Sequence, residues 1–208
     1  MGLISAFLCG NRLRNGNKNV YINRVAVMMR LFIAVNCDDE TKKLILSIQE
    51  KIKSQSFKGN FSRPENIHLT LVFLGDTPEN QVPSICSAIK EALKPPVTPF
   101  SLAFSQTGCF THSKKELWWI GAEHTDPSLG TLKNLRQRIT GGLSAADVAF
   151  DDRPFNPHIT LGREIKHNAP IVIDRQKIIF PVNRISLMKS ERLDRVLVYT
   201  EIFGQNLE

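Results

Sequence analysis

Apolar and polar residues alternate in several short stretches of the chain, and these stretches predict the strands of a sheet. The stretch RLFIAV at residues 30–35 is the first convincing strand, and residues 63–75, RPENIHLTLVFLG, contain another. Side chains leave a strand on alternate sides, so His68 and Thr70 share one face. The apolar residues beside them share the opposite face, which predicts a hydrophobic core on one side of the sheet only: Ile67, Leu69 and Leu71.

Three longer stretches carry apolar residues at the spacing of amphipathic helices. The first, within residues 36–52, opens with acidic residues that complement the helix dipole. The second lies within residues 76–93 and is expected to open at Thr77 and Pro78. The third is expected to begin at Asp126 and Pro127 and to stop at the glycine pair of residues 141–142.

The rest of the chain is read as further strands and their connections. KPPVTP at residues 94–99 can be neither helix nor central strand. We expect a strand pair from FSLAFSQTG at residues 100–108 and ELWWIGAEH at residues 116–124. Four short apolar runs complete the predicted strands: residues 171–173, 178–180, 185–188 and 196–203. Strands connected by hairpins together with about three helices indicate an α+β protein.

One segment of the chain occurs twice. RPENIHLTL at residues 63–71 and RPFNPHITL at residues 153–161 agree at six of nine positions, and the offset is 90 residues. We therefore expect a bilobal fold of two pseudo-symmetric lobes. Each lobe would be an antiparallel sheet with helices on the outside and one His-x-Thr strand beside a central cleft.

A cleft holding two imidazoles and two hydroxyls has the groups that phosphodiester chemistry needs. One histidine can take a proton from the attacking oxygen while the other gives one to the leaving oxygen, because the reference pKa is near neutrality. Threonine hydroxyls can donate to the non-bridging oxygens, where charge develops. The candidates are His68, His158, Thr70 and Thr160.

Metal binding is the rival use of two histidines. A hydrolytic zinc site usually has three protein ligands, often two histidines four residues apart on a helix. The sequence has no such spacing, although Asp76 and Asp152 lie near the two motifs. We expect neither a metal nor another cofactor.

The charge of the chain is concentrated at its start. The net charge is +7, and residues 1–28 contribute four basic residues and no acidic one. The remaining excess suits a local anionic site better than a broad duplex-binding face. We interpret residues 1–28 as a disordered extension or an initiation codon placed too far upstream, with an organelle-targeting segment as the alternative, and residues 29–208 as one bilobal domain.

Two further properties bear on the location of the protein. No apolar run approaches the roughly 20 residues that span a bilayer, so no membrane association is expected. The four cysteines are far apart and include no Cys-x-x-Cys pair, which favours a reducing cytoplasm. We expect a monomer.

The paired motifs HLTL at residues 68–71 and HITL at residues 158–161 resemble the two H-x-T-x motifs of the 2H phosphoesterase superfamily. Within it, the chain is most similar to bacterial and archaeal RNA 2′,3′-cyclic phosphodiesterases, also called 2′-5′ RNA ligases. The likeness extends from MRLFIAV at residue 29 to VYTEIF at residues 198–203.

The resemblance implies the role of each residue. One histidine activates water against a 2′,3′-cyclic phosphate and the other protonates the departing 3′ oxygen, which leaves a 2′-phosphate. By motif position His68 would be the proton donor and His158 the proton acceptor. Thr70 and Thr160 would hold the phosphate, without a metal.

Arg163 matches an arginine that many members carry after the second motif. By strict alternation its side chain leaves the face opposite to His158. A phosphate-binding role for Arg163 therefore requires the strand to end or to bulge at Gly162.

Other residues near the motifs have structural interpretations. Arg63 and Arg153, each followed by proline, are expected to fix loops or lie at the rim rather than to clamp phosphate. Phe110 and Phe155 could stack on a base, but core packing is the preferred interpretation. Trp118 and Trp119 are expected at the core and rim of the sheet.

The motifs and their resemblance are compatible with three functions. The first is hydrolysis of RNA ends that carry a 2′,3′-cyclic phosphate, with the reverse chemistry joining 2′-5′ linkages. The second keeps the site but acts on a small nucleotide, such as a cyclic phosphate of ADP-ribose. The third is a module that binds RNA ends without turnover.

Overall fold

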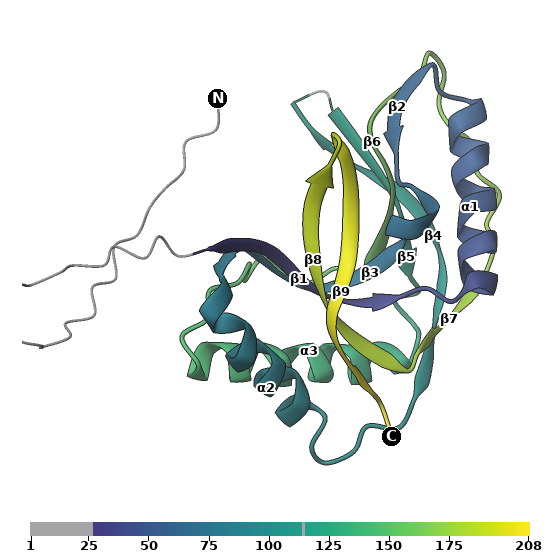
Figure 1. The fold of residues 1–208 in the computed structure, drawn as a ribbon. Helices are drawn as coiled ribbons and strands as arrows, with labels where there is room; N and C mark the ends of the chain where they lie inside the picture. The colour runs from purple at the N-terminus through teal and green to yellow at the C-terminus, as the bar shows by residue number, and fades with distance from the viewer. Residues whose placement is uncertain (1–26, 114) are drawn as a thin grey trace, which may run out of the picture.

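The computed structural model describes residues 27–113 and 115–208, so the predictions for the leader before residue 27 lie outside the described residues. Nine strands form one sheet, and three α-helices and two short 3-10 helices connect them (Figure 1). The helices are α1 (Asp39–Ser54), η1 (Pro64–Asn66), η2 (Glu79–Gln81), α2 (Val82–Ala92) and α3 (Ser128–Ala145). The strands are β1 (Met28–Asn36), β2 (Lys58–Phe61), β3 (His68–Pro78), β4 (Phe100–His112), β5 (Lys115–Ala122), β6 (His158–Lys166), β7 (Ile178–Val182), β8 (Arg184–Leu193) and β9 (Val196–Asn206).

The sheet has a pseudo-twofold strand order. It runs β7-β4-β5-β6-β3-β1-β8-β9, with β2 added at β6, and every pairing is antiparallel. The middle is the contact between β3 and β6, and the two halves extend outwards from it in the same way. The α+β class and the two related halves are confirmed, although the halves share one continuous sheet.

The core lies on one face of this sheet. Leu31, Ile33 and Val35 of β1 point into it, and the buried apolar residues of all three helices belong to the same cluster. In Figure 1, α2 and α3 lie side by side at one end, and α1 stands along the opposite edge. No described helix is long and apolar enough to cross a membrane.

The face opposite the helices is called the site face here. It includes Phe32 and Ala34, which alternate with the core residues of β1 and form a separate small cluster with Met188. Phe73 and Tyr199 pack against that cluster. The two faces of β1 therefore have different functions, one packing the core and one lining the surface that carries both histidines.

The helix α1 begins where its sequence predicts. The Asp38 carboxylate caps it by accepting a hydrogen bond from the Thr41 backbone N–H at 2.7 Å. Its buried face carries Ile45, Ile48 and Ile52 at helical spacing. The predicted strand pair of β4 and β5 and the irregular connection at residues 94–99 are also confirmed.

Three element boundaries were predicted wrongly. Thr77 and Pro78 do not open a helix, because they pair with β1 as the last residues of β3. Residues 171–173 form no strand: the Gln55 side-chain amide bonds both the N–H and the C=O of Val172, as a neighbouring strand would.

The third error concerns α3, which continues through both glycines to Ala145 instead of stopping there. A Cβ on Gly142 would lie 3.0 Å from the Ala88 Cβ of α2. This glycine therefore allows the two helices to pack closely and does not cap the helix.

The two central strands, β3 and β6, each contain two bulges. The bulges lie at equivalent positions in the two halves. Against β1, the strand β3 has one extra residue at Leu71 and another at Leu74. Against β5, the strand β6 has extra residues at Leu161 and Glu164, again 90 residues later. A bulge reverses the alternation of the residues that follow it.

Helix side chains hold the first bulge of each strand. The Gln49 amide of α1 donates to the carbonyl oxygens of Leu161 at 2.7 Å and Ser62 at 2.8 Å. In the other half, Nε of Arg136 on α3 donates to the Leu71 carbonyl oxygen at 3.1 Å. The bulges therefore depend on long-range contacts with the helices.

This arrangement predicts the effect of replacing Gln49, which is almost fully buried. Gln49→Met keeps the shape but removes both donors, and a lost buried hydrogen bond costs about 1–3 kcal/mol. We expect urea denaturation to show a free energy of unfolding lower by about that amount. Lys43→Met, on the exposed side of the same helix, is the control; equal stability of both variants would contradict a role for Gln49 in holding the bulge.

Candidate active site

The site is centred on a single backbone pair. Leu69 of β3 lies opposite Ile159 of β6, and both side chains are fully buried in the core. The residues on either side of this pair therefore leave the sheet on the site face. They are the four residues that the repeat predicted: His68, Thr70, His158 and Thr160.

The register also decides which of these side chains are neighbours. In an antiparallel pair, the residues flanking Leu69 and Ile159 face each other crosswise. His68 lies across from Thr160, and His158 lies across from Thr70. The charge of His158 acts on His68, so the structure brings the two motifs together into one site.

Both imidazoles are oriented in the same way. Nδ1 of His68 lies 2.8 Å from the carbonyl oxygen of Asn66, and Nδ1 of His158 lies 2.7 Å from that of Asn156. A carbonyl can only accept, so these partners assign the proton of each neutral ring to Nδ1. Nε2 is left in both rings as the nitrogen that can exchange a proton with a ligand.

His68 is enclosed by aromatic rings. Its ring centroid lies 4.8 Å from that of Phe32 and 5.2 Å from that of Tyr199. Its Nε2 atom lies 2.9 Å from the hydroxyl oxygen of Thr70. Burial lowers the pKa of His68 to about 4, and the positive charge of Arg163 acts in the same direction, whereas the bond to Asn66 opposes it.

His158 is less enclosed. The edges of Phe110 and Trp119 pack beside it, at centroid distances of 5.4 Å and 6.3 Å. Burial lowers its pKa below the usual 6.5, and the charge of Arg163 lowers it further. Both imidazoles of the free protein are therefore neutral at pH 7.

Arg163 reaches the site face because of the bulge in β6. Leu161 and Gly162 are both buried, and the next residue, Arg163, is exposed. Its charge acts on His68, His158 and the phenol of Tyr199, so the guanidinium lies near all three. The structural condition for a phosphate-binding role is met, while the role itself stays a prediction.

The loop arginines contact carboxylates next to them in sequence. Arg63 lies 3.5 Å from the Glu65 carboxylate, and Arg153 donates through Nε to both carboxylate oxygens of Asp151 at 2.9 Å. Both are exposed. The prediction that they belong to the loops or the rim is confirmed.

The aromatic predictions are confirmed for three of the four side chains. Trp118 is buried in the core, Trp119 lies half-buried on the site face, and Phe155 packs against the core below the guanidinium of Arg136. The prediction that Phe110 packs in the core is wrong, because 41% of it is exposed. It lies on the site face, because it pairs with Leu117, which shares a face of β5 with Trp119, the partner of Thr160.

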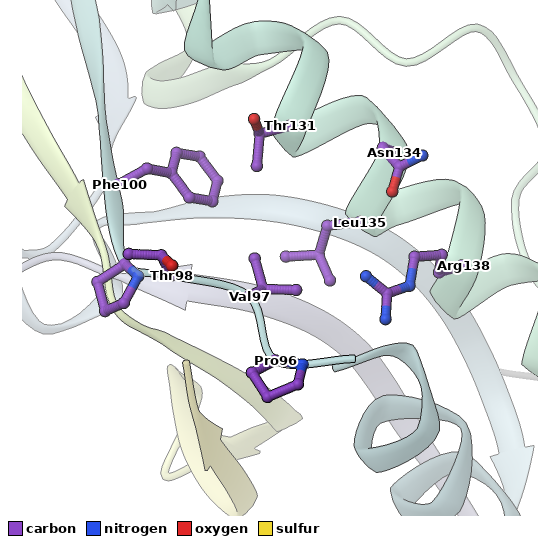
Figure 2. A pocket seen from close by; sticks show the side chains of 9 residues that line it. Pro96, Val97, Thr98, Phe100, Thr131, Asn134, Leu135 and Arg138 are labelled. Carbon is purple, nitrogen blue, oxygen red and sulfur yellow. The ribbon is translucent and has the colours of Figure 1, made fainter. Parts of the chain in front are cut away.

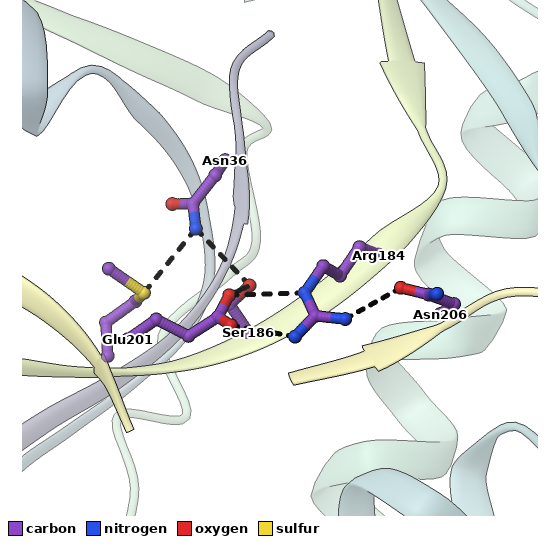
Figure 3. Close-up of polar contacts among 6 residues, drawn as sticks. Asn36, Arg184, Ser186, Glu201 and Asn206 are labelled. Carbon is purple, nitrogen blue, oxygen red and sulfur yellow. Dashed lines mark hydrogen bonds and ion pairs between the residues drawn. The ribbon is translucent and has the colours of Figure 1, made fainter. Parts of the chain in front are cut away.

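A hydrogen-bonded network supports the site face beside His68 (Figure 3). Arg184 donates to the carboxylate of Glu201 at 2.8 Å and to the Asn206 side chain at 2.7 Å. Ser186 donates to the same carboxylate and accepts from Nδ2 of Asn36 at 3.3 Å. Asn36 pairs with His68 across the strands. Hydrogen bonds from Arg184 lower the pKa of Glu201, so this carboxylate stays ionised and its charge is balanced.

A pocket of about 400 Å³ lies elsewhere in the molecule, between the connection before β4 and the helix α3 (Figure 2). Val97, Phe100, Leu135 and Arg138 are among the side chains that line it. None of the predicted site residues lines this pocket. Within residues 27–113 and 115–208, no group of three or more histidine, cysteine and acidic side chains is placed to hold a metal ion.

Several site residues were not predicted from the sequence. Phe32 and Tyr199 come from distant strands, and only the register of β1, β8 and β9 brings them to His68. Asn66 and Asn156 act through their backbone carbonyls. The repeated asparagine in the two nine-residue segments was the available signal for them.

Comparisons with known proteins agree with this geometry. The family model described as the 2'-5' RNA ligase superfamily matches residues 39–194, which include all five candidate residues. A Thermus thermophilus protein named RNA 2',3'-cyclic phosphodiesterase is 32% identical over 179 residues, 83% of this chain and 87% of that protein. A Thermotoga maritima protein of the same name is 36% identical over 140 residues, 65% of this chain and 70% of that protein.

Solved structures show the same fold. The apo form of E. coli LigT has a TM-score of 0.71 at 22% identity, covering 86% of this chain and 98% of that one. The structure of TT0787 from Thermus thermophilus has a TM-score of 0.64 at 29% identity, with the same coverage. The paired motifs, the strand register around them and the family match lead to one conclusion: the chain belongs to the 2'-5' RNA ligase superfamily.

Proposed function

We propose that the protein hydrolyses 2′,3′-cyclic phosphate ends of RNA to 2′-phosphates, with His68 and His158 as the proton-transfer pair and without a metal. The observation that carries the proposal is the pair of imidazoles around Leu69 and Ile159, each with Nδ1 fixed and Nε2 directed to the site. Relatives named RNA 2',3'-cyclic phosphodiesterase support the substrate class.

In the proposed reaction, water attacks phosphorus and the bond between phosphorus and O3′ breaks. Nε2 of His158 takes a proton from the water as its oxygen bonds to phosphorus. Nε2 of His68 gives a proton to O3′, so the ribose 3′-hydroxyl is restored and the phosphate stays on O2′. A 5′-hydroxyl attacking in place of water would join a 2′-5′ linkage with the same roles, and the pair would exchange roles when that linkage is cleaved back to the cyclic phosphate.

Arg163 and the two threonines would bind the phosphate. A guanidinium forms strong charge-assisted hydrogen bonds to phosphate oxygens, and hydroxyls donate without ionising. The bound anion would raise the pKa of both histidines, because it favours their charged forms. Substrate binding would thus supply the protonated His68 that the free site does not hold at pH 7.

The direct test is conversion of a short RNA that ends in a 2′,3′-cyclic phosphate, in the presence and absence of EDTA. We expect a 2′-phosphate end formed at the same rate in both. A rate abolished by EDTA would contradict the metal-independent scheme. Faster turnover of a cyclic phosphate of ADP-ribose would favour a small nucleotide as substrate, and binding without any product would indicate a non-catalytic module.

Replacement of each histidine separates their roles. Acid or base assistance is typically worth about 10² to 10⁴ in rate, so His68→Ala and His158→Ala should each lose roughly that much. A leaving group that departs as a stable anion needs no proton. A diester with such a group should therefore restore the rate of His68→Ala but not that of His158→Ala. Rescue of His158→Ala instead would exchange the roles, and full activity of either variant on the RNA would refute the mechanism.

The pH dependence follows from the lowered pKa values. The reactive pair carries one proton, and burial holds the pKa of His68 at about 4 and that of His158 below 6.5. The singly protonated pair of the free protein therefore predominates between about pH 4 and the pKa of His158, which lies below 6.5. We expect kcat/KM to peak in that acidic range and kcat, which reports on the complex with the anionic phosphate, to peak at higher pH. A kcat/KM that rises steadily through pH 7 would be inconsistent with these pKa values.

Arg163 affects both binding and proton transfer. Arg163→Gln removes a charged donor worth about 1.5–3 kcal/mol, so kcat/KM should fall roughly 10-fold to 100-fold. Because the charge of Arg163 lowers the pKa of both histidines, its loss should also move the kcat/KM optimum to higher pH. Arg163→Lys, which keeps the charge, should keep the optimum. An unshifted optimum in Arg163→Gln would leave Arg163 without an electrostatic role.

A further inference from the structure

The two halves of the site are alike at the two His-x-Thr motifs but differ in the strands that flank them, which are β5 beside β6 and β1 beside β3. The residue of β5 opposite Thr160 is Trp119, whereas the residue of β1 opposite Thr70 is Ala34. A nucleoside cyclic phosphate is itself asymmetric, because its base is attached beside only one of the two bridging oxygens. The different flanks can therefore select one of two orientations of the substrate.

The flank beside His158 is built to carry a flat aromatic surface. A Cβ on Gly108 or on Gly121 would lie only 2.7 Å from the indole of Trp119, so both glycines make room for this ring against the sheet. Phe110 packs on the indole at 5.2 Å with an angle of 32° between the ring planes. With 41% of Phe110 exposed, an aromatic surface is open to solvent next to His158.

The flank beside His68 exposes less aromatic surface than the flank beside His158. Phe32 is 4% exposed, and Tyr199 packs edge-on against both Phe32 and His68, with interplanar angles of 71° and 85°. These rings contact one another and belong to the small apolar cluster of the site face. Their packing leaves less ring surface for a ligand than the pair of Phe110 and Trp119.

We propose that the base of the terminal nucleotide stacks on Phe110, supported by Trp119, and that this contact decides which phosphate ester bond breaks. The inference rests on the proposed function. Stacking of bases on aromatic side chains is a general mode of binding unpaired nucleic acid. Phe110 is thus a substrate-binding residue that determines the product isomer.

The chemical reason lies in the ribose. O2′ is on the carbon next to the base-bearing carbon, and O3′ is one carbon further away. A base held at the His158 flank therefore places O2′ towards His158 and O3′ towards His68. Water deprotonated by His158 then attacks phosphorus, the bond to O3′ breaks, and His68 protonates O3′. The opposite orientation would break the bond to O2′ and give a 3′-phosphate.

One further observation points to a ligand at this flank. The indole N–H of Trp119 is buried and has no hydrogen-bond partner among the residues that the structure describes. Buried polar groups without partners are uncommon in native proteins.

The test compares two substrates in the wild type and in variants of Phe110. One substrate is a short RNA ending in adenosine 2′,3′-cyclic phosphate, and the other is methyl riboside 2′,3′-cyclic phosphate, which has no base. Product isomers are identified by phosphorus NMR. The variants are Phe110→Ala, Phe110→Leu, which keeps apolar bulk without a π face, and Phe110→Tyr, which keeps the ring. Phe57→Ala, an exposed phenylalanine outside the site face, is the control.

We expect Phe110→Ala and Phe110→Leu to raise KM for the RNA by about 5-fold to 100-fold, the value of one stacked base, and to form some 3′-phosphate. Phe110→Tyr and Phe57→Ala should resemble the wild type. The riboside should give both isomers, with the same KM in all proteins. A wild-type KM and a single product in Phe110→Leu would overturn the inference, as would equal losses on both substrates.

Failure of this inference can be distinguished from failure of the proposed function. If the wild type converts neither substrate, the proposed function is wrong, and binding of adenosine 2′-phosphate by calorimetry still tests the stacking. The affinity should fall in Phe110→Leu and remain in Phe110→Tyr. Weaker binding in Tyr199→Leu, with no such loss in Phe110→Leu, would place the base on the opposite flank and contradict the inference.

Discussion

The contact between β3 and β6 at Leu69 and Ile159 is the constraint on which the site depends. It joins the two halves of the sheet, and its two side chains are fixed in the core. A shift of one residue in either strand would move the histidine of that strand to the helix-covered face and bring its buried partner, Leu69 or Ile159, to the site face. The hydrophobic burial of these two residues therefore sets the relative position of the catalytic candidates.

The site combines two electrostatic requirements that oppose each other. Arg163 attracts an anionic phosphate, but its positive charge and the burial of the rings disfavour protonated imidazoles. The free protein therefore holds two neutral histidines beside the Arg163 cation. A phosphate anion reverses this balance, so a proton becomes available on the histidine pair when the substrate arrives.

The sequence predicted the parts of this structure that depend on local patterns. Alternation placed His68 and Thr70 on one face of a strand, and the repeat at an offset of 90 residues predicted two related halves. The bulge that turns Arg163 to the site was a stated condition for its role but could not be predicted. It is held by the amide of Gln49, which lies more than a hundred residues away in the chain. Gly142 was misjudged for a similar reason, because its role depends on Ala88 of a separate helix.

The central claim is that His68 and His158 form one coupled pair with the same tautomer and lowered pKa values. Imidazole NMR titration with ¹⁵N-labelled histidine measures both properties directly, in the free protein and with adenosine 2′-phosphate. We expect Nδ1–H tautomers for both rings, pKa values below 6.5 with His68 near 4, and an increase in both when the phosphate binds. An Nε2–H tautomer, or a His68 that titrates at 6.5 or above and does not respond to the phosphate, would contradict the claim.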